Sequence, residues 1–129
     1  MSDESMVLRV DGPVVDAELA DPKYPQGTIV RVRMLVDTGA ELSVVPRDLI
    51  DALGLPRTRE IEIAGVVPRA FAWCPVFRVV LHVGGGAFDV EVAALARDEV
   101  SGGIIGRDVL SHLVFTYDGP RGVFAFGAP

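Results

Sequence analysis

Apolar and polar residues alternate along most of the chain, and clusters of Gly, Pro and Asp separate the alternating stretches. Successive side chains of an extended strand point to opposite faces, so this period of two is typical of strands with one buried face. β-Branched and aromatic residues are frequent in the same stretches, which also favours strands. The pattern predicts strands over residues 13–20, 28–36, 59–66, 70–83, 87–95, 114–117 and 123–126.

Short turn-rich connections join neighbouring strands into hairpins. Residues 21–27 connect the first two strands, and Val67-Pro68-Arg69 connects the next two. The run Gly84-Gly85-Gly86 predicts a tight turn before the strand over 87–95, and residues 118–122 predict the turn of a last hairpin.

Only two segments have a helical pattern. Residues 47–53 follow Pro46 and are stopped by Gly54, and a second, shorter segment covers about 107–113. The expected fold class is therefore all-β, with one or two short helices.

The length fits one domain over residues 1–129, because half of the 129 residues are hydrophobic, enough for one core but not two. Acidic residues outnumber basic ones by 18 to 12 and neither sign forms a block, so nucleic acid and membrane are not expected partners. The start carries Asp3 and Glu4 where a secretory signal would be positive, and no apolar run is long enough for a membrane helix. We expect a soluble, cytoplasmic protein.

The cysteine, histidine and tryptophan side chains do not indicate a catalytic or metal site. Cys74 is the only cysteine, which excludes an intrachain disulfide and favours a small core residue. His82 and His112 have no companion at the spacing of metal ligands, so no metal site is expected. Trp73 is most simply a core aromatic, with a place in a substrate-binding wall as the alternative.

One carboxylate stands where the fold does not need it. The apolar strand that ends at Val36 runs directly into Asp37-Thr38-Gly39-Ala40. By itself this sequence could be an ordinary turn in which the Asp side chain accepts a backbone hydrogen bond.

A second motif follows about seventy residues later, where Ile104-Ile105-Gly106-Arg107-Asp108 precedes the second helix. Alone it could be a buried strand running into a helix. Together, in this order, the two motifs resemble the retropepsin family of aspartic peptidases and its cellular and bacterial relatives. The resemblance covers about residues 13–126.

The resemblance implies a closed β-barrel protomer with a flap hairpin between the two motifs, here at residues 60–75. It implies substrate contacts from Ala40 and from the flap residues Gly65, Val66 and Val67. Ile104 and Ile105 would form apolar walls that favour large apolar side chains at the cleaved bond.

The resemblance also implies a homodimer that acts on peptides without metal or cofactor. Two carboxylates that share one proton can catalyse the hydrolysis of a peptide bond, because one activates water and the other protonates the carbonyl oxygen. One Asp-Thr-Gly motif supplies only one of these carboxylates. In a two-fold dimer Asp37 would face its own image. Thr38 would hydrogen-bond across the axis, and Gly39 would let the backbone approach the pair.

Further residues of the resemblance concern support and assembly. Glu41 and Arg107, which follows Gly106, would form a partly buried ion pair behind the catalytic loop. The last hairpin would offer apolar surface to the dimer interface through Phe115, Tyr117, Phe124 and Phe126.

Two alternatives stay open from the sequence. The first is a catalytically silent domain of the same fold that serves dimerisation or peptide binding. The second is a small β-barrel with no aspartyl site, which would be monomeric.

Overall fold

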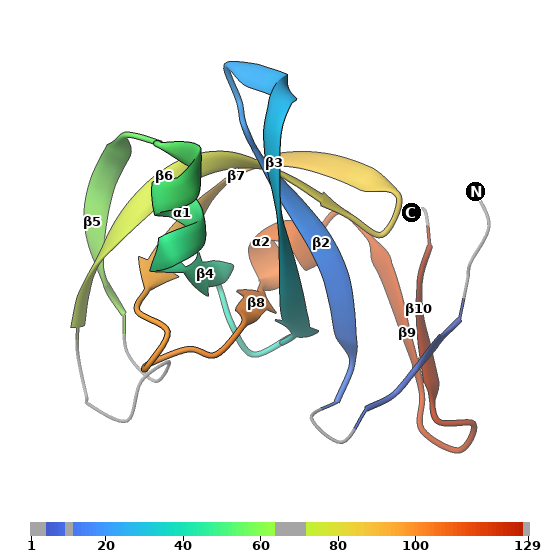
Figure 1. Cartoon of the computed structure of the whole chain (residues 1–129). Coiled ribbons are helices and arrows are strands. Elements are labelled where there is room, and N and C mark those ends of the chain that lie inside the picture. Colours follow the sequence, from blue (N-terminus) through green and yellow to red (C-terminus); the bar gives the residue numbers. More distant parts are fainter. Residues whose placement is uncertain (1–4, 10–11, 64–71, 128–129) are drawn as a thin grey trace.

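The computed structural model describes residues 5–9, 12–63 and 72–127 (Figure 1). Its elements follow one another as β1 (Met6–Val7), β2 (Val14–Asp21), β3 (Tyr24–Val36), β4 (Val44–Pro46), α1 (Arg47–Leu53), β5 (Arg57–Ile63), β6 (Ala72–Val83), β7 (Gly86–Leu95), β8 (Gly103–Ile105), α2 (Arg107–Leu110), β9 (Val114–Asp118) and β10 (Val123–Gly127). The expected all-β class with two short helices is confirmed.

Seven strands form one sheet in the order β2-β3-β8-β4-β7-β6-β5, and an additional pairing of β2 with β6 curls the sheet into a ring. The ring is barrel-like but not a strictly closed barrel, which corrects the expectation of full closure. β2 and β6 share three residue pairs, and β4 and β8 share only Val44 and Ile104. A separate sheet in the order β1-β10-β9 lies beside the ring (Figure 1).

The predicted hairpins are present where the structure describes them. β2 pairs antiparallel with β3, β5 with β6, β6 with β7, and β9 with β10. The flap hairpin is therefore seen at its base, whereas residues 64–71 lie outside the described part. β3 begins at Tyr24 rather than residue 28, because the chain reverses over Pro22 and Lys23 and the register then shifts after Ala20.

Three short strands were not predicted, and each lacks the alternating pattern. β4 is buried at all three positions, so no polar residue marks a second face. β8 lies between β3 and β4, parallel to β3. β1 pairs with β10 over only two residues.

Helix α1 has the predicted bounds. It ends at Gly54, whose φ of 65° is in the left-handed region that favours glycine. Helix α2 is shorter than expected and stops at Leu110, after one turn.

Two aromatic residues of the last hairpin belong to the core rather than to an outer surface. Phe124 and Phe126 are 1% and 4% exposed and join the main hydrophobic cluster. The prediction that they offer apolar surface to a partner is wrong for these two, because their side of β10 faces the ring. Tyr117, Val7 and Val114 are the exposed large apolar residues of this sheet.

Trp73 is 68% exposed, so the expectation of a core aromatic is wrong. It lies opposite Glu62 in the β5–β6 pair, whereas the next residue, Cys74, is buried in a smaller cluster with Val44 and Ala93. The side chains of consecutive strand residues point to opposite faces, and Cys74 takes the inner one.

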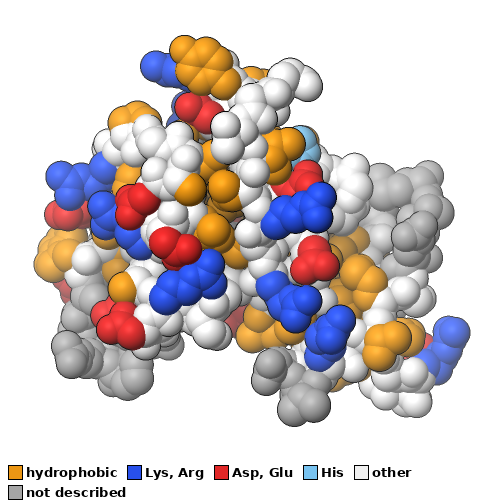
Figure 2. All heavy atoms as spheres, viewed as in Figure 1, with side chains coloured by type: hydrophobic (Ala, Val, Ile, Leu, Met, Phe, Trp, Pro, Cys, Tyr) orange, Lys and Arg blue, Asp and Glu red, His pale blue; other side chains and the backbone are white. Residues whose placement is uncertain are grey.

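Acidic and basic side chains intermingle over the face shown in Figure 2, with apolar patches between them. Among the described residues, no helix is long and apolar enough to cross a membrane.

Candidate active site

The first motif and the second motif meet in the centre of the sheet. β3 and β8 run parallel, with Leu35 beside Ile104 and Val36 beside Ile105. The pairing extends one step further, because the backbone N–H of Asp37 donates to the carbonyl of Ile105 at 2.9 Å. Asp37 therefore stands at the point where two neighbouring strands end.

A local turn sets the Asp37 carboxylate. Oδ1 accepts a hydrogen bond from the backbone N–H of Gly39 at 2.9 Å, and the N–H of Ala40 donates to the Asp37 carbonyl at 3.2 Å. A Cβ on Gly39 would lie 3.2 Å from that same Oδ1, so glycine leaves room for the carboxylate. Asp37 and Ala40 are half-buried, whereas Thr38 and Gly39 are exposed.

Gly106 holds the loop against the start of α2. A Cβ there would lie 2.8 Å from the carbonyl carbon of Leu42 and 2.9 Å from the carbonyl oxygen of Ala40. Backbone atoms cannot move aside as a flexible side chain can. The close approach lets Arg107 N–H donate to the Ala40 carbonyl at 2.8 Å, so glycine here ties the two motifs together.

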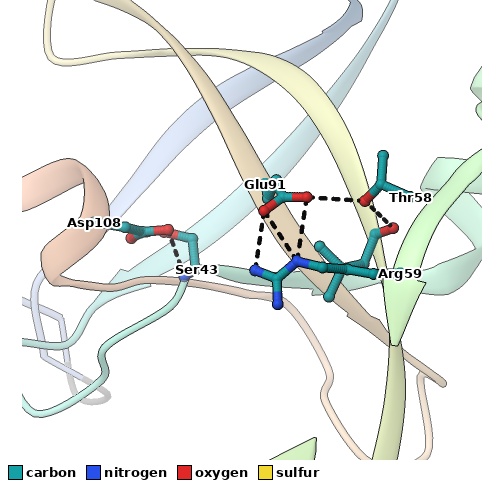
Figure 3. A network of polar contacts seen from close by, with 6 residues as sticks. Ser43, Thr58, Arg59, Glu91 and Asp108 are labelled. Carbon is teal, nitrogen blue, oxygen red and sulfur yellow. Dashed lines mark hydrogen bonds and ion pairs between the residues drawn. The ribbon is translucent and has the colours of Figure 1, made fainter. Parts of the chain in front are cut away.

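Behind the loop lies a polar network that sequence reasoning missed (Figure 3). Ser43 is fully buried, and its hydroxyl donates to Oδ1 of Asp108 at 2.7 Å while accepting from the N–H of Gly106 at 3.0 Å. The N–H of Ser43 donates to Oδ2 of Asp108 at 3.0 Å. One serine and one aspartate thus join both motifs. One signal of this network was present in the sequence, because Ser43 stands between Leu42 and Val44 in an apolar run. A hydroxyl that is buried there needs a hydrogen-bond partner.

The expected pair of Glu41 and Arg107 is present but weak. The two charged groups are 3.9 Å apart, and their side chains are 91% and 48% exposed. The expectation of partial burial is therefore wrong for the single chain. Arg107 has another partner, because its Nη1 donates to the Thr38 carbonyl at 2.8 Å and so contacts the Asp37 loop directly.

A hollow of about 580 Å³ is lined by the ends of β3 and β8 that lead into this site, although no residue of the Asp37 loop itself lines it. Its apolar lining includes Val14, Leu35, Val100 and Ile104, and Leu35 stands two residues before Asp37. Of the two expected apolar walls, Ile104 lines the hollow and is partly exposed. Ile105 is wholly buried in the core, so its expected substrate contact is corrected.

Gly65, Val66 and Val67 lie outside the described residues. A larger hollow of about 880 Å³ lies against β2, β3 and the turn at 84–86, and no residue of the Asp37 loop lines it. The part of the chain that the structure describes holds no group of three or more metal-binding side chains.

The barrel-like ring and an Asp-Thr-Gly loop at the ends of its central strands define the class of an aspartic peptidase protomer. The family described as "Aspartyl protease" matches residues 24–109, which is more than half of the chain and includes both motifs. The chain belongs to this family.

Solved structures show the same fold. A retropepsin-like aspartic protease from Rickettsia conorii aligns with a TM-score of 0.62 and 18% identity, over 97% of this chain and 89% of that one. The simian foamy virus protease aligns with a TM-score of 0.54 and 14% identity, over 77% of this chain and 92% of that one. The EIAV protease, solved with the inhibitor HBY-793, aligns with a TM-score of 0.51 and 22% identity, over 77% of this chain and 85% of that one. No curated protein sequence matches. The retropepsin-like identification is thus confirmed.

Proposed function

We propose that the protein is an aspartic endopeptidase whose catalytic pair is formed by Asp37 of two protomers. The observation that carries the proposal is the Asp37 loop, which stands at the ends of β3 and β8 with Thr38 and Gly39 exposed. The chain has one such loop, so a pair requires a second copy. Two-fold symmetry brings a residue near the axis onto its own image.

The chemistry needs no group beyond the pair and water. One Asp37 carboxylate accepts a proton from water as the water oxygen forms a bond to the peptide carbonyl carbon. The other, protonated, carboxyl donates its proton to the carbonyl oxygen. As the carbon–nitrogen bond of the tetrahedral intermediate breaks, the leaving amine takes a proton from one carboxyl of the pair. One hydroxyl of the intermediate gives its proton to the other carboxylate, so the acid product is released and the pair again holds one proton. Two carboxylates about 3 Å apart hold one proton between them, because both cannot be charged at that distance.

The hollow beside Leu35 and Ile104 supports a peptide substrate with a large apolar side chain near the cleaved bond. Substrate-binding sites are concave and combine apolar side chains with polar groups that fix orientation, and this lining holds both. Arg33 and Glu99 also line the hollow and give its rim both charges.

Cleavage of a diverse peptide mixture between pH 4 and 8 tests the proposal. We expect Asp37→Asn to abolish cleavage and to keep the fold, because an amide can neither accept the proton nor share it. The matched control is Asp51→Asn, an exposed aspartate on α1, which should cleave as the wild type does. Equal cleavage by wild type and Asp37→Asn, or none by either, would contradict the proposal. The second outcome favours a silent binding domain.

Dimer dependence is measured separately. Specific activity should fall on dilution, in step with loss of the dimer in light scattering. A monomer that cleaves at full rate would exclude the shared pair.

A further inference from the structure

The segment between β7 and β8 forms one wall of the hollow lined by Leu35 and Ile104. Glu99, Val100, Ser101 and Gly102 all line it. Within the segment, the N–H groups of Glu99 and Val100 donate to the Ala96 carbonyl at 2.9 and 3.0 Å, which makes a local turn. This turn supports the start of the wall, and the pairing of Gly103 with Met34 fixes its end at β8. Ser101, between these two points, is where a second support from a side chain can act.

Arg97 supplies that second support. Its Nη1 donates to the carbonyl of Ser101 at 2.8 Å, across the wall segment. Its Nε and Nη2 donate to the two carboxylate oxygens of Asp48 at 2.9 and 3.2 Å. The guanidinium thus makes three directed contacts, two to α1 and one to the wall.

The planar guanidinium suits this arrangement, because its donors are fixed relative to one another. Asp48 stands in the first turn of α1, a helix that packs on the ring. The contact with Arg97 lowers the pKa of the Asp48 carboxyl, so Asp48 is charged at neutral pH. Both side chains are about half exposed, so the contact adds little to the stability of the fold. Its main effect is to fix the position of the wall segment relative to α1.

The structure assigns to Arg97 a role as a positioning residue for the substrate-binding hollow: it ties the wall at Ser101 to Asp48 on α1. This inference rests on the proposed function for its substrate, but the position of the wall can be measured without catalysis. A misplaced wall should weaken the binding of the peptide while Asp37 and its water stay in place.

The molecule contains a matched control. Arg78 makes the same two-pronged contact with Asp89, at 3.1 and 2.9 Å, and the two side chains are exposed to a similar degree. That pair joins β6 to β7 and lines neither hollow. Arg78→Ala therefore removes an equal ion pair without touching the wall.

Steady-state cleavage of peptides with a large apolar residue at the cut is the first measurement. We expect Arg97→Ala to raise KM about fivefold or more with kcat changed less than about twofold, since the loss is in binding. Asp48→Ala should act in the same direction but less, because Arg97 keeps its contact with Ser101. Arg78→Ala should leave both constants unchanged. Equal effects of Arg97→Ala and Arg78→Ala, or a fall in kcat alone, would overturn the inference.

Hydrogen exchange of the amides over residues 99–103 is the second measurement, and it needs no activity. We expect about tenfold faster exchange in Arg97→Ala than in wild type, and no change in Arg78→Ala, because local opening rises when a local contact is lost. Unchanged exchange in Arg97→Ala overturns the inference even if the enzyme is active. If wild type cleaves no peptide, the proposed function fails and the substrate role of Arg97 with it, whereas faster exchange still establishes Arg97 as the support of the wall.

Discussion

Figure 3 shows two polar networks that differ in how far they are exposed to water. One joins Ser43 to Asp108 behind the Asp37 loop, and Ser43 is fully buried. The other joins Arg59 and Thr58 of β5 to Glu91 of β7, with Arg59 about half exposed. The second network has two charged side chains instead of one and more hydrogen bonds, but it is exposed to water.

Burial decides how much each network contributes. Water replaces the partners of an exposed ion pair at little cost, so such pairs contribute about 0 to 1 kcal/mol. A buried group that loses its partner pays the full cost of desolvation, about 1 to 3 kcal/mol and more where a charge is involved. We therefore expect the Ser43–Asp108 network to contribute most to stability and to the position of the Asp37 loop. The network of Arg59, Thr58 and Glu91 should change stability only slightly.

Ser43→Ala is the variant with the largest expected effect. It removes the hydroxyl that donates to Asp108 and accepts from Gly106, so a buried N–H loses its acceptor. We expect the free energy of unfolding to fall by about 2 to 4 kcal/mol in a urea titration. Cleavage should also fall, because the loop that carries Asp37 is held through Gly106.

The control is Ser111→Ala, since Ser111 is exposed at the end of α2. It should change stability by less than about 0.5 kcal/mol. The comparison of the two networks would be broken if both serine variants lost the same small amount.

Alternating hydrophobicity was enough to predict the long hairpins, because one face of each strand is buried, and Pro46 and Gly54 marked the ends of α1. It could not show β4 or β8, because each has only three residues and none of them is polar, so the sequence shows no alternation. The Asp37 loop was found because its motif and the Ile104-Ile105-Gly106 motif, in this order, together resemble the retropepsin family. Ser43 was not, because a single hydroxyl shows its partner only when a residue 65 positions away is placed beside it.

The exposed pair of Arg107 and Glu41 gives an intermediate test. Glu41→Ala should lower stability by about 0.5 kcal/mol or less, since the ion pair is long and exposed. Arg107→Ala should cost more, about 1 kcal/mol, because it also loses the hydrogen bond to the Thr38 carbonyl.

Denaturant titration of the two variants beside Lys23→Ala, at an exposed turn, measures the difference. A larger loss for Glu41→Ala than for Arg107→Ala would show that the ion pair, not the contact with Thr38, is what Arg107 supplies.

The expected effect at Glu91 is also small, and it depends on pH. Hydrogen bonds from Arg59 and Thr58 lower the pKa of the Glu91 carboxyl from its usual 4.5. The folded protein therefore releases this proton more readily than the unfolded chain, so the contact stabilises the fold above about pH 4.5 and the benefit is lost as pH falls below it.

Glu91→Gln should lower the free energy of unfolding by about 1 kcal/mol or less at pH 7, because water screens the exposed ion pair. The difference from wild type should shrink at pH 3 and in 1 M salt, where the Debye length is about 3 Å, whereas the loss in Ser43→Ala should not respond to salt. Urea titrations of wild type, Glu91→Gln and Ser43→Ala at both pH values and both salt concentrations measure this. A Glu91→Gln difference that grows toward low pH would reverse the assigned sign and place the stabilising contact elsewhere.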